Sequence, residues 1–392
     1  MSALSPPLRE SANIAHVLAA SAAFLGACLL WHIQPMMARF MLPHMGGSAA
    51  VWTTALVFYQ SALVLGYGYA HWVSRCGKTG LIMHGVALGA SWLIFPISEL
   101  SVRGMTASLA PALQVLTWLG LTIGIPYVLL SATAPLTQAL APKDTHHSPY
   151  RLFAWSNLGS ILGLLAYPFW VESSLGLQQQ SALWFGGFLV FAVLMGLTMA
   201  THRTAPLETP SDESPAPLTR LTWMALSALG VAFLMAISDA IAADLTVTPV
   251  LWVLPLFAYL LSFVICFGNP AWAHGAVWRG ATVISAVVTV WLLYAGWRVP
   301  WWVQLGLWCA VLFSGCMLFH GELVRRRPSP QLLTRYYLDM SIGGAVSGVL
   351  VGIVAPALLP VRIEMHLITL FAALLAVRSW LKSRRDTHPF ES

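Results

Sequence analysis

Polar side chains follow the first apolar run of the chain, at a point where a simple membrane span would need none. Residues 17–30 carry no charge, and the stretch WHIQPMMARF that follows them contains His32, Gln34 and Arg39. Polar and ionisable groups at membrane depth are costly to bury, so they usually mark a solute pathway or binding site. We therefore predict that His32 and Gln34 bind a solute. The alternative is that His32 lies at the interface, in contact with water or lipid headgroups.

Two carboxylates occupy the corresponding part of a later apolar run. Asp239 and Asp244 lie in FLMAISDAIAADL, near the end of the predicted seventh span. A buried acid there needs either a partner or a proton, and a carboxylate is suited to bind a cationic solute. We predict that both acids bind solute and that Asp239 faces His32 and Gln34.

A third polar set lies toward the other ends of the apolar runs. Asn157 and Asp339 are predicted to bind solute, and His320 and Glu322, in FHGELVRRRP, to form a gate or a partner surface. Asp339 has the alternative role of a structural ion pair with a nearby arginine. No spacing typical of a catalytic triad, a carboxylate pair or a metal site is present, so we assign no catalytic residue or metal ligand; the cofactor question stays open.

The composition identifies the environment in which these side chains must be placed. Of the 392 residues, 58% are hydrophobic and 9% are charged, whereas a soluble domain carries about 25% charged residues. The sequence therefore predicts an all-α integral membrane protein whose main partner is the lipid bilayer. The net charge of +6 is attributed to the loops, and no nucleic-acid partner is expected.

Apolar windows of about 20 residues, the length needed to cross a bilayer, predict twelve transmembrane helices. The windows are 14–33, 50–72, 80–98, 109–131, 151–171, 181–200, 221–242, 249–268, 277–296, 300–320, 334–356 and 363–381. The first is expected to be a retained helix rather than a signal peptide, because no basic segment precedes it.

The basic residues predict the orientation of these spans. If the N-terminus is cytoplasmic, only Arg39, Arg103, Arg298 and Arg362 of the 20 lysines and arginines lie outside. Cytoplasmic loops carry the excess of basic residues in membrane proteins. Both termini are therefore predicted to be cytoplasmic.

The chain divides into two similar parts. Residues 201–220, THRTAPLETPSDESPAPLTR, form a predicted cytoplasmic linker between an N-terminal half (1–200) and a C-terminal half (221–392). YRLFAWSNLGSILGLLAYP (150–168) and YYLDMSIGGAVSGVLVGIVAP (336–356) occupy the same ordinal helix of each half and repeat glycines four residues apart. This recurrence favours two parallel six-helix halves of the major-facilitator type.

Several segments carry a family resemblance. QPMMARFMLPHMGGSAAVWTTALVFYQSALVLGYGYAH (34–71), LSATAPLTQAL, SPYRLFAWSNLGS, VLWVLPLFAYLLSF and FHGELVRRRPSP resemble the membrane half of the fused major-facilitator/spermidine-synthase proteins of bacteria. The resemblance implies a major-facilitator-like fold, a location in the inner membrane of a bacterium and a connection with polyamines. The fused proteins continue into an aminopropyltransferase-like domain. We expect no synthase activity here, because this sequence has no strand–glycine-loop–helix unit.

Three functions are compatible with these observations. The first is a transporter of a small solute, such as a polyamine or another organic cation. The second is a membrane-embedded enzyme or a docking subunit for a separately encoded synthase-like enzyme, in which His32, His320, Glu322 and Asp339 would hold a substrate or cofactor. The third is a structural subunit of a membrane complex.

Overall fold

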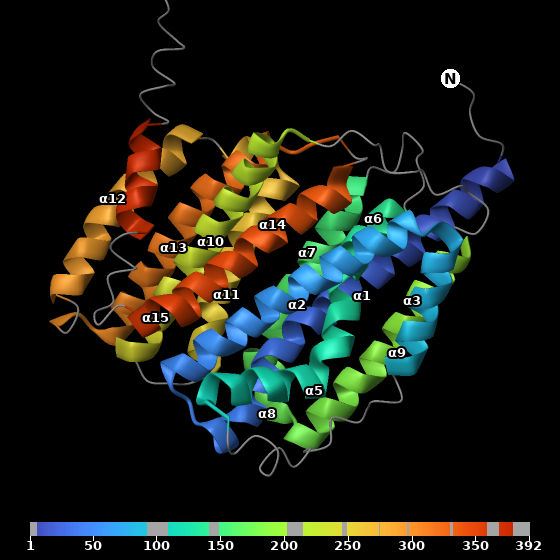
Figure 1. Cartoon of the computed structure of the whole chain (residues 1–392), viewed down its shortest axis with the longest axis horizontal. Coiled ribbons are helices and arrows are strands. Elements are labelled where there is room, and N and C mark those ends of the chain that lie inside the picture. Colours follow the sequence, from blue (N-terminus) through green and yellow to red (C-terminus); the bar gives the residue numbers. More distant parts are fainter. Residues whose placement is uncertain are drawn as a thin grey trace, which may run out of the picture. The chain divides into compact units, whose positions relative to one another are not determined.

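The computed structural model describes residues 6–91, 109–140, 149–201, 215–244, 249–273, 275–295, 298–329, 332–358 and 368–378. All regular structure within these ranges is helical. The helices are α1 (Pro6–Met45), α2 (Ala49–Arg75), α3 (Gly77–Ser91), α5 (Pro111–Ser131), α6 (Thr133–Ala139), α7 (Pro149–Ala166), η2 (Tyr167–Val171), α8 (Glu172–Ser174), α9 (Leu177–Thr201), α10 (Pro217–Asp244), α11 (Pro249–Gly268), η4 (Pro270–Ala273), α12 (Gly275–Ala295), α13 (Trp301–Arg325), α14 (Leu333–Val349), η7 (Leu350–Val354) and α15 (Ala355–Leu358) (Figure 1).

The predicted all-α membrane fold is confirmed. Eight helices in the described part of the chain are long and apolar enough to cross a membrane, and two shorter apolar helices occupy Val253–Gly268 and Ile368–Arg378. Each predicted window contains helix, although residues 92–98, residue 296 and the two ends of the twelfth window lie outside the described residues. Most of the predicted linker also lies outside them.

Helices form here because a backbone in lipid must satisfy its hydrogen bonds internally. Large apolar side chains cover the outward faces of α9 and α12, including Val190, Val193, Val287 and Val290, each more than half exposed. Such surfaces are stable only against lipid or a partner. The protein is accordingly a multi-pass membrane protein.

The described chain clusters into two compact units. The first comprises Met1–Gly46, Phe58–Ala216 and Pro328–Ser341, and the second comprises Gly47–Val57, Pro217–Arg327 and Ile342–Ser392. Both α2 and α14 therefore contribute residues to each unit. The division of the chain into halves at 201–220 stays a prediction.

In the first unit, α1 packs along α7 through glycine (Figure 1). A Cβ placed on Gly159 would overlap the carbonyl oxygen of Phe24, and one on Gly163 would overlap that of Cys28. Two glycines four residues apart on one face thus let the two backbones touch.

In the second unit, the same type of contact recurs between α14 and α10. A Cβ placed on Gly343 would overlap the carbonyl oxygen of Met224. Gly343 thus has a close backbone contact of the kind that Gly159 and Gly163 make in the first unit. The predicted internal repeat stays a prediction.

A second feature repeats in the two glycine-bearing helices. α7 continues into the π-helical segment η2, which contains Pro168, and α14 continues into the π-helical segment η7, which contains Gly352. π-helical turns are rare and occur frequently at functional sites. Both segments follow the glycine contact at a similar distance along the helix.

Candidate functional site

His32 in α1 contacts α7 and η2. Its Nδ1 lies 3.3 Å from the carbonyl oxygen of Gly163, and its ring meets that of Tyr167 edge to face at 5.4 Å between centroids. A carbonyl oxygen accepts and never donates, so Nδ1 must carry the hydrogen. The Nε2 atom of the neutral ring then offers a lone pair. His32 is buried, and its role in binding a solute stays a prediction.

Gln34 lies on another face of α1. Residues two apart are separated by about 200° around a helix, and the Gln34 amide donates through Nε2 to the hydroxyl of Tyr127 in α5 at 3.3 Å. The ring of Tyr127 lies 5.2 Å from that of Tyr59 in α2. The structure therefore does not bring His32 and Gln34 into one contact, although the sequence analysis grouped them.

The Tyr59 hydroxyl completes this second arrangement. Tyr59 is buried, and its hydroxyl has no hydrogen-bond partner among the described residues. Gln34, Tyr59 and Tyr127 form what we call the Tyr–Gln cluster. Sequence reasoning missed both tyrosines. Their presence within the apolar runs around VFYQ and IPYV was the available signal, because a phenol in a membrane helix needs a partner for its hydroxyl.

The Tyr–Gln cluster combines two kinds of binding group. The amide and the two phenols supply hydrogen-bond donors and acceptors, and the aromatic faces attract cations. Phe58 adds a third ring, 6.2 Å from that of Tyr127. The arrangement can bind a small solute that carries an ammonium group or several hydrogen-bonding groups.

Asn157 and Arg39 occupy separate places in the first unit. Asn157 in α7 is buried, and its Nδ2 has no partner among the described residues. Arg39, near the end of α1, forms an ion pair with Glu172 of α8. That carboxylate is therefore already neutralised by an arginine.

Asp339 lies in a charged cluster formed by α2 and the first turns of α14. Its side chain is fully buried, and its Oδ1 lies 3.4 Å from the Nε of Arg335. In the same unit, Nδ1 of His71 lies 3.1 Å from the hydroxyl of Thr334, and Arg335 and Asp339 are within electrostatic range of that imidazole. The structure thus shows the ion pair with a nearby arginine that was the alternative for Asp339.

The two acids of α10 lie in the second unit. Asp239 is half-buried, and Asp244 is the last residue of α10, with its side chain outside the described residues. His32 and Gln34 belong to the first unit. The predicted approach of Asp239 to them stays a prediction.

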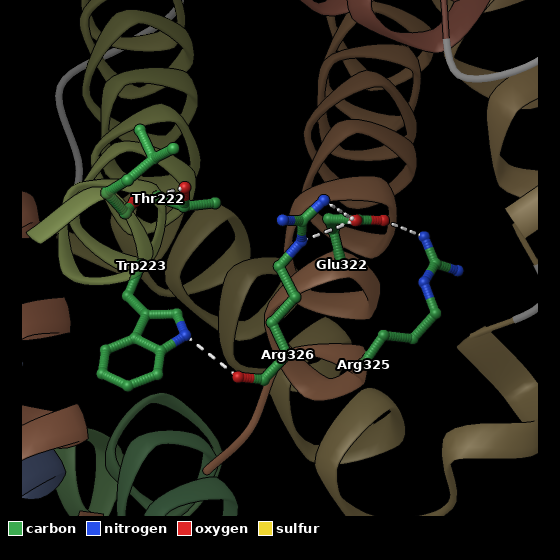
Figure 2. A network of polar contacts seen from close by, with 6 residues as sticks. Thr222, Trp223, Glu322, Arg325 and Arg326 are labelled. Atoms are coloured by element: carbon green, nitrogen blue, oxygen red, sulfur yellow. Dashed lines mark hydrogen bonds and ion pairs between the residues drawn. The ribbon is translucent and has the colours of Figure 1, made fainter. Parts of the chain in front are cut away.

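His320 and Glu322 in α13 point to different neighbours. The His320 ring is fully buried, with Nδ1 3.0 Å from the hydroxyl of Ser262 in α11. Glu322 is half-buried at the end of the same helix and pairs with Arg325 and Arg326. Figure 2 shows the carboxylate between the two guanidinium groups, and the Trp223 indole donating to the Arg326 carbonyl oxygen at 3.0 Å.

Glu322→Gln is expected to lower the free energy of unfolding by about 1 kcal/mol or less, because both arginines are half exposed and keep much of their hydration. Thermal unfolding of the purified protein measures this change. A markedly larger loss would mean that the carboxylate is a structural centre of this end of α13 rather than a surface group.

Metal-binding geometry is not found in the described part of the chain: no three His, Cys, Asp or Glu side chains lie together in a suitable arrangement. The five cysteines are free thiols, of which Cys266 and Cys316 are buried.

Solved structures decide the fold class. The chain is similar to a POT family transporter in complex with 5-aminolevulinic acid, with a TM-score of 0.57 and 12% identity, over 94% of this chain and 96% of that one. The chain shares the fold of that protein. A POT family transporter in complex with a thioalcohol-conjugated peptide is similar with a TM-score of 0.53, at the same identity and coverage.

Sequence comparison adds no family to this likeness. No family model matches the chain, and no curated protein matches it either. The resemblance to the fused spermidine-synthase proteins therefore stays a prediction.

Proposed function

We propose that the protein moves a small polar solute across the membrane and binds it at the Tyr–Gln cluster. The observation that carries this proposal is the transporter fold, which extends over 94% of the chain. A solute-binding transporter needs polar groups inside its helices, and the cluster supplies an amide and two phenols. The hydroxyl of Tyr59 has no hydrogen-bond partner among the residues that the structure describes.

The solute is proposed to carry an amino group. The similar structures hold 5-aminolevulinic acid and a conjugated peptide, and a polyamine is the solute suggested by the sequence resemblance. An ammonium group would rest against the faces of Tyr59 and Tyr127 and donate to phenol and amide oxygens. Asp239 and Asp244 are proposed as further attracting charges, with Asn157 as an additional polar contact.

Uptake by the reconstituted protein tests this function. Proteoliposomes are supplied with radiolabelled putrescine, 5-aminolevulinic acid or a dipeptide, and counterflow of each probe is measured. At least one is expected to accumulate. Accumulation of none would contradict the proposal and favour a docking subunit.

Tyr59→Phe is expected to lower uptake of the active probe about tenfold, because it removes one hydrogen bond worth about 1.4 kcal/mol to the bound solute. The matched control is Tyr294→Phe in α12, since Tyr294 is 83% exposed. Equal uptake by the Tyr59 variant and the parent would remove the Tyr–Gln cluster from the pathway.

A further inference from the structure

The hydrogen-bond pattern around His320 determines which ring nitrogen carries the hydrogen. The Ser262 hydroxyl lies 2.7 Å from the Tyr259 carbonyl oxygen and 3.0 Å from Nδ1 of His320. A carbonyl oxygen can only accept, so the single hydroxyl hydrogen of Ser262 goes to it. Nδ1 must then donate to the serine oxygen. The neutral ring consequently has its lone pair on Nε2.

The Nε2 atom of His320 lies close to the backbone of α10 at Gly230. Nε2 has no partner among the described residues, and a Cβ placed on Gly230 would lie 3.0 Å from it. The rings of Tyr259 and Phe263 meet the imidazole edge to face at 5.1 and 4.9 Å between centroids. Because the contact is so close, a proton is the one ligand that can bind to this fully buried nitrogen without movement of the helices.

In the described part of the chain, no side chain or backbone group is placed to form a hydrogen bond with Nε2 of His320. α10 presents Gly230 at this level, nine residues from Asp239 and ten from Arg220, and η4 contributes no titratable side chain. The guanidinium groups of Arg279 and Arg325 converge on Gly275, while Glu322 is already paired. Among the titratable groups of α11 and α13, Tyr259 meets the ring edge to face, and Cys316 lies against the Gly230 carbonyl oxygen. Cys266 lies near the carbonyl oxygen of Met317.

We propose that His320 is a proton-binding site that controls the contact between α10 and α13. A proton taken from water by Nε2 creates an N–H⁺ directed at the Gly230 backbone with nothing to accept it. This buried, unpartnered charge destabilises the closed contact and favours separation of the two helices, which lets water reach the ring. Release of the proton restores the contact. If the protein is the transporter proposed above, this switch makes its cycle depend on pH.

Cys316 is a reporter built into the same contact. Its thiol is fully buried and lies 3.9 Å from the Gly230 carbonyl oxygen, so separation of α10 and α13 would expose it. The unaltered protein is treated with N-ethylmaleimide at several pH values, and mass spectrometry quantifies the modified Cys316 peptide. The rate is divided by that of the unfolded protein at the same pH, because the intrinsic reactivity of a thiol falls as the pH falls.

The normalised rate is expected to rise about tenfold from about pH 8 to about pH 5, the interval in which imidazole groups usually change charge. His320→Gln should abolish the rise. The matched control is His84→Gln in α3, because His84 is an equally buried imidazole, with Nδ1 3.2 Å from the Tyr69 hydroxyl. A rate that does not change with pH, or a rise that survives His320→Gln, would overturn the proposal.

A second measurement needs no substitution. Nitrogen-15 NMR of histidine-labelled protein at about pH 8 reports the tautomer of each ring, and the His320 signal is expected to show hydrogen on Nδ1 and a lone pair on Nε2. Hydrogen on Nε2 instead would overturn the proposal even if His320→Gln fails to fold. Both measurements use no solute, so their outcome is independent of whether uptake is found.

Discussion

Gly159→Ala is expected to lower the stability of the protein by about 3 kcal/mol or to prevent its folding, as strong overpacking does. The added methyl group would overlap the Phe24 carbonyl oxygen. A carbonyl oxygen belongs to the backbone and cannot rotate away, so α1 and α7 would have to move apart. Thermal unfolding of the purified protein measures the loss of stability, and size-exclusion chromatography shows whether the variant folds.

The matched control is Gly196→Ala in α9, where an added Cβ meets nothing within 4 Å. That variant should be neutral or more stable by up to about 1 kcal/mol, because alanine favours helix over glycine. Gly343→Ala tests the repeat, since it should behave like Gly159→Ala through its contact with Met224. If Gly159→Ala unfolds at the temperature of the parent, the two helix backbones are not in contact as described.

Asp339→Asn is expected to lower stability by about 3–5 kcal/mol, the usual cost of removing one member of a buried ion pair. The fully buried carboxylate faces Arg335, whose side chain is 34% exposed. Without the negative charge, the arginine would remain partly buried beside a neutral amide. Thermal unfolding again provides the measurement.

Two further variants determine whether the loss of stability in Asp339→Asn arises from its ion pair with Arg335. Asp339→Asn combined with Arg335→Gln should be less harmful than the sum of the single changes, because the double variant leaves no uncompensated charge. Glu172→Gln, whose partner Arg39 is 44% exposed, should cost much less. If the stability losses of the two single variants add up to that of the double variant, Asp339 has a role independent of Arg335, such as the predicted contact with a solute.

The prediction of an all-α membrane fold followed from composition alone. Runs such as residues 17–30 are long, apolar and uncharged, and a segment of this kind can satisfy its backbone in lipid only as a helix. The residues at which the helices begin and end were harder to predict. α1 extends over 40 residues and contains Pro35 and Pro43, although proline usually interrupts a helix.

The sequence analysis selected polar residues within the predicted membrane helices, but most of their contacts could not be derived from it. The spacing of His32 and Gln34 suggested one site, whereas helix geometry turns them toward Gly163 and Tyr127 respectively. Tyr59 was not selected, because a tyrosine within an apolar run is usually a packing residue. Only the structure showed that its hydroxyl has no hydrogen-bond partner in the described part of the chain.

The sequence by itself determined the membrane environment, the helical fold and the recurrence of glycines in two distant helices, because hydropathy and residue size are properties of single positions. Only the tertiary structure decided that Gly159 and Gly343 each meet the backbone of a neighbouring helix and that Asp339 pairs with Arg335. It also decided that Nε2 of His320 faces the Gly230 backbone. These outcomes depend on how neighbouring helices are rotated and how closely they pack, and that arrangement arises from contacts between residues far apart in the chain.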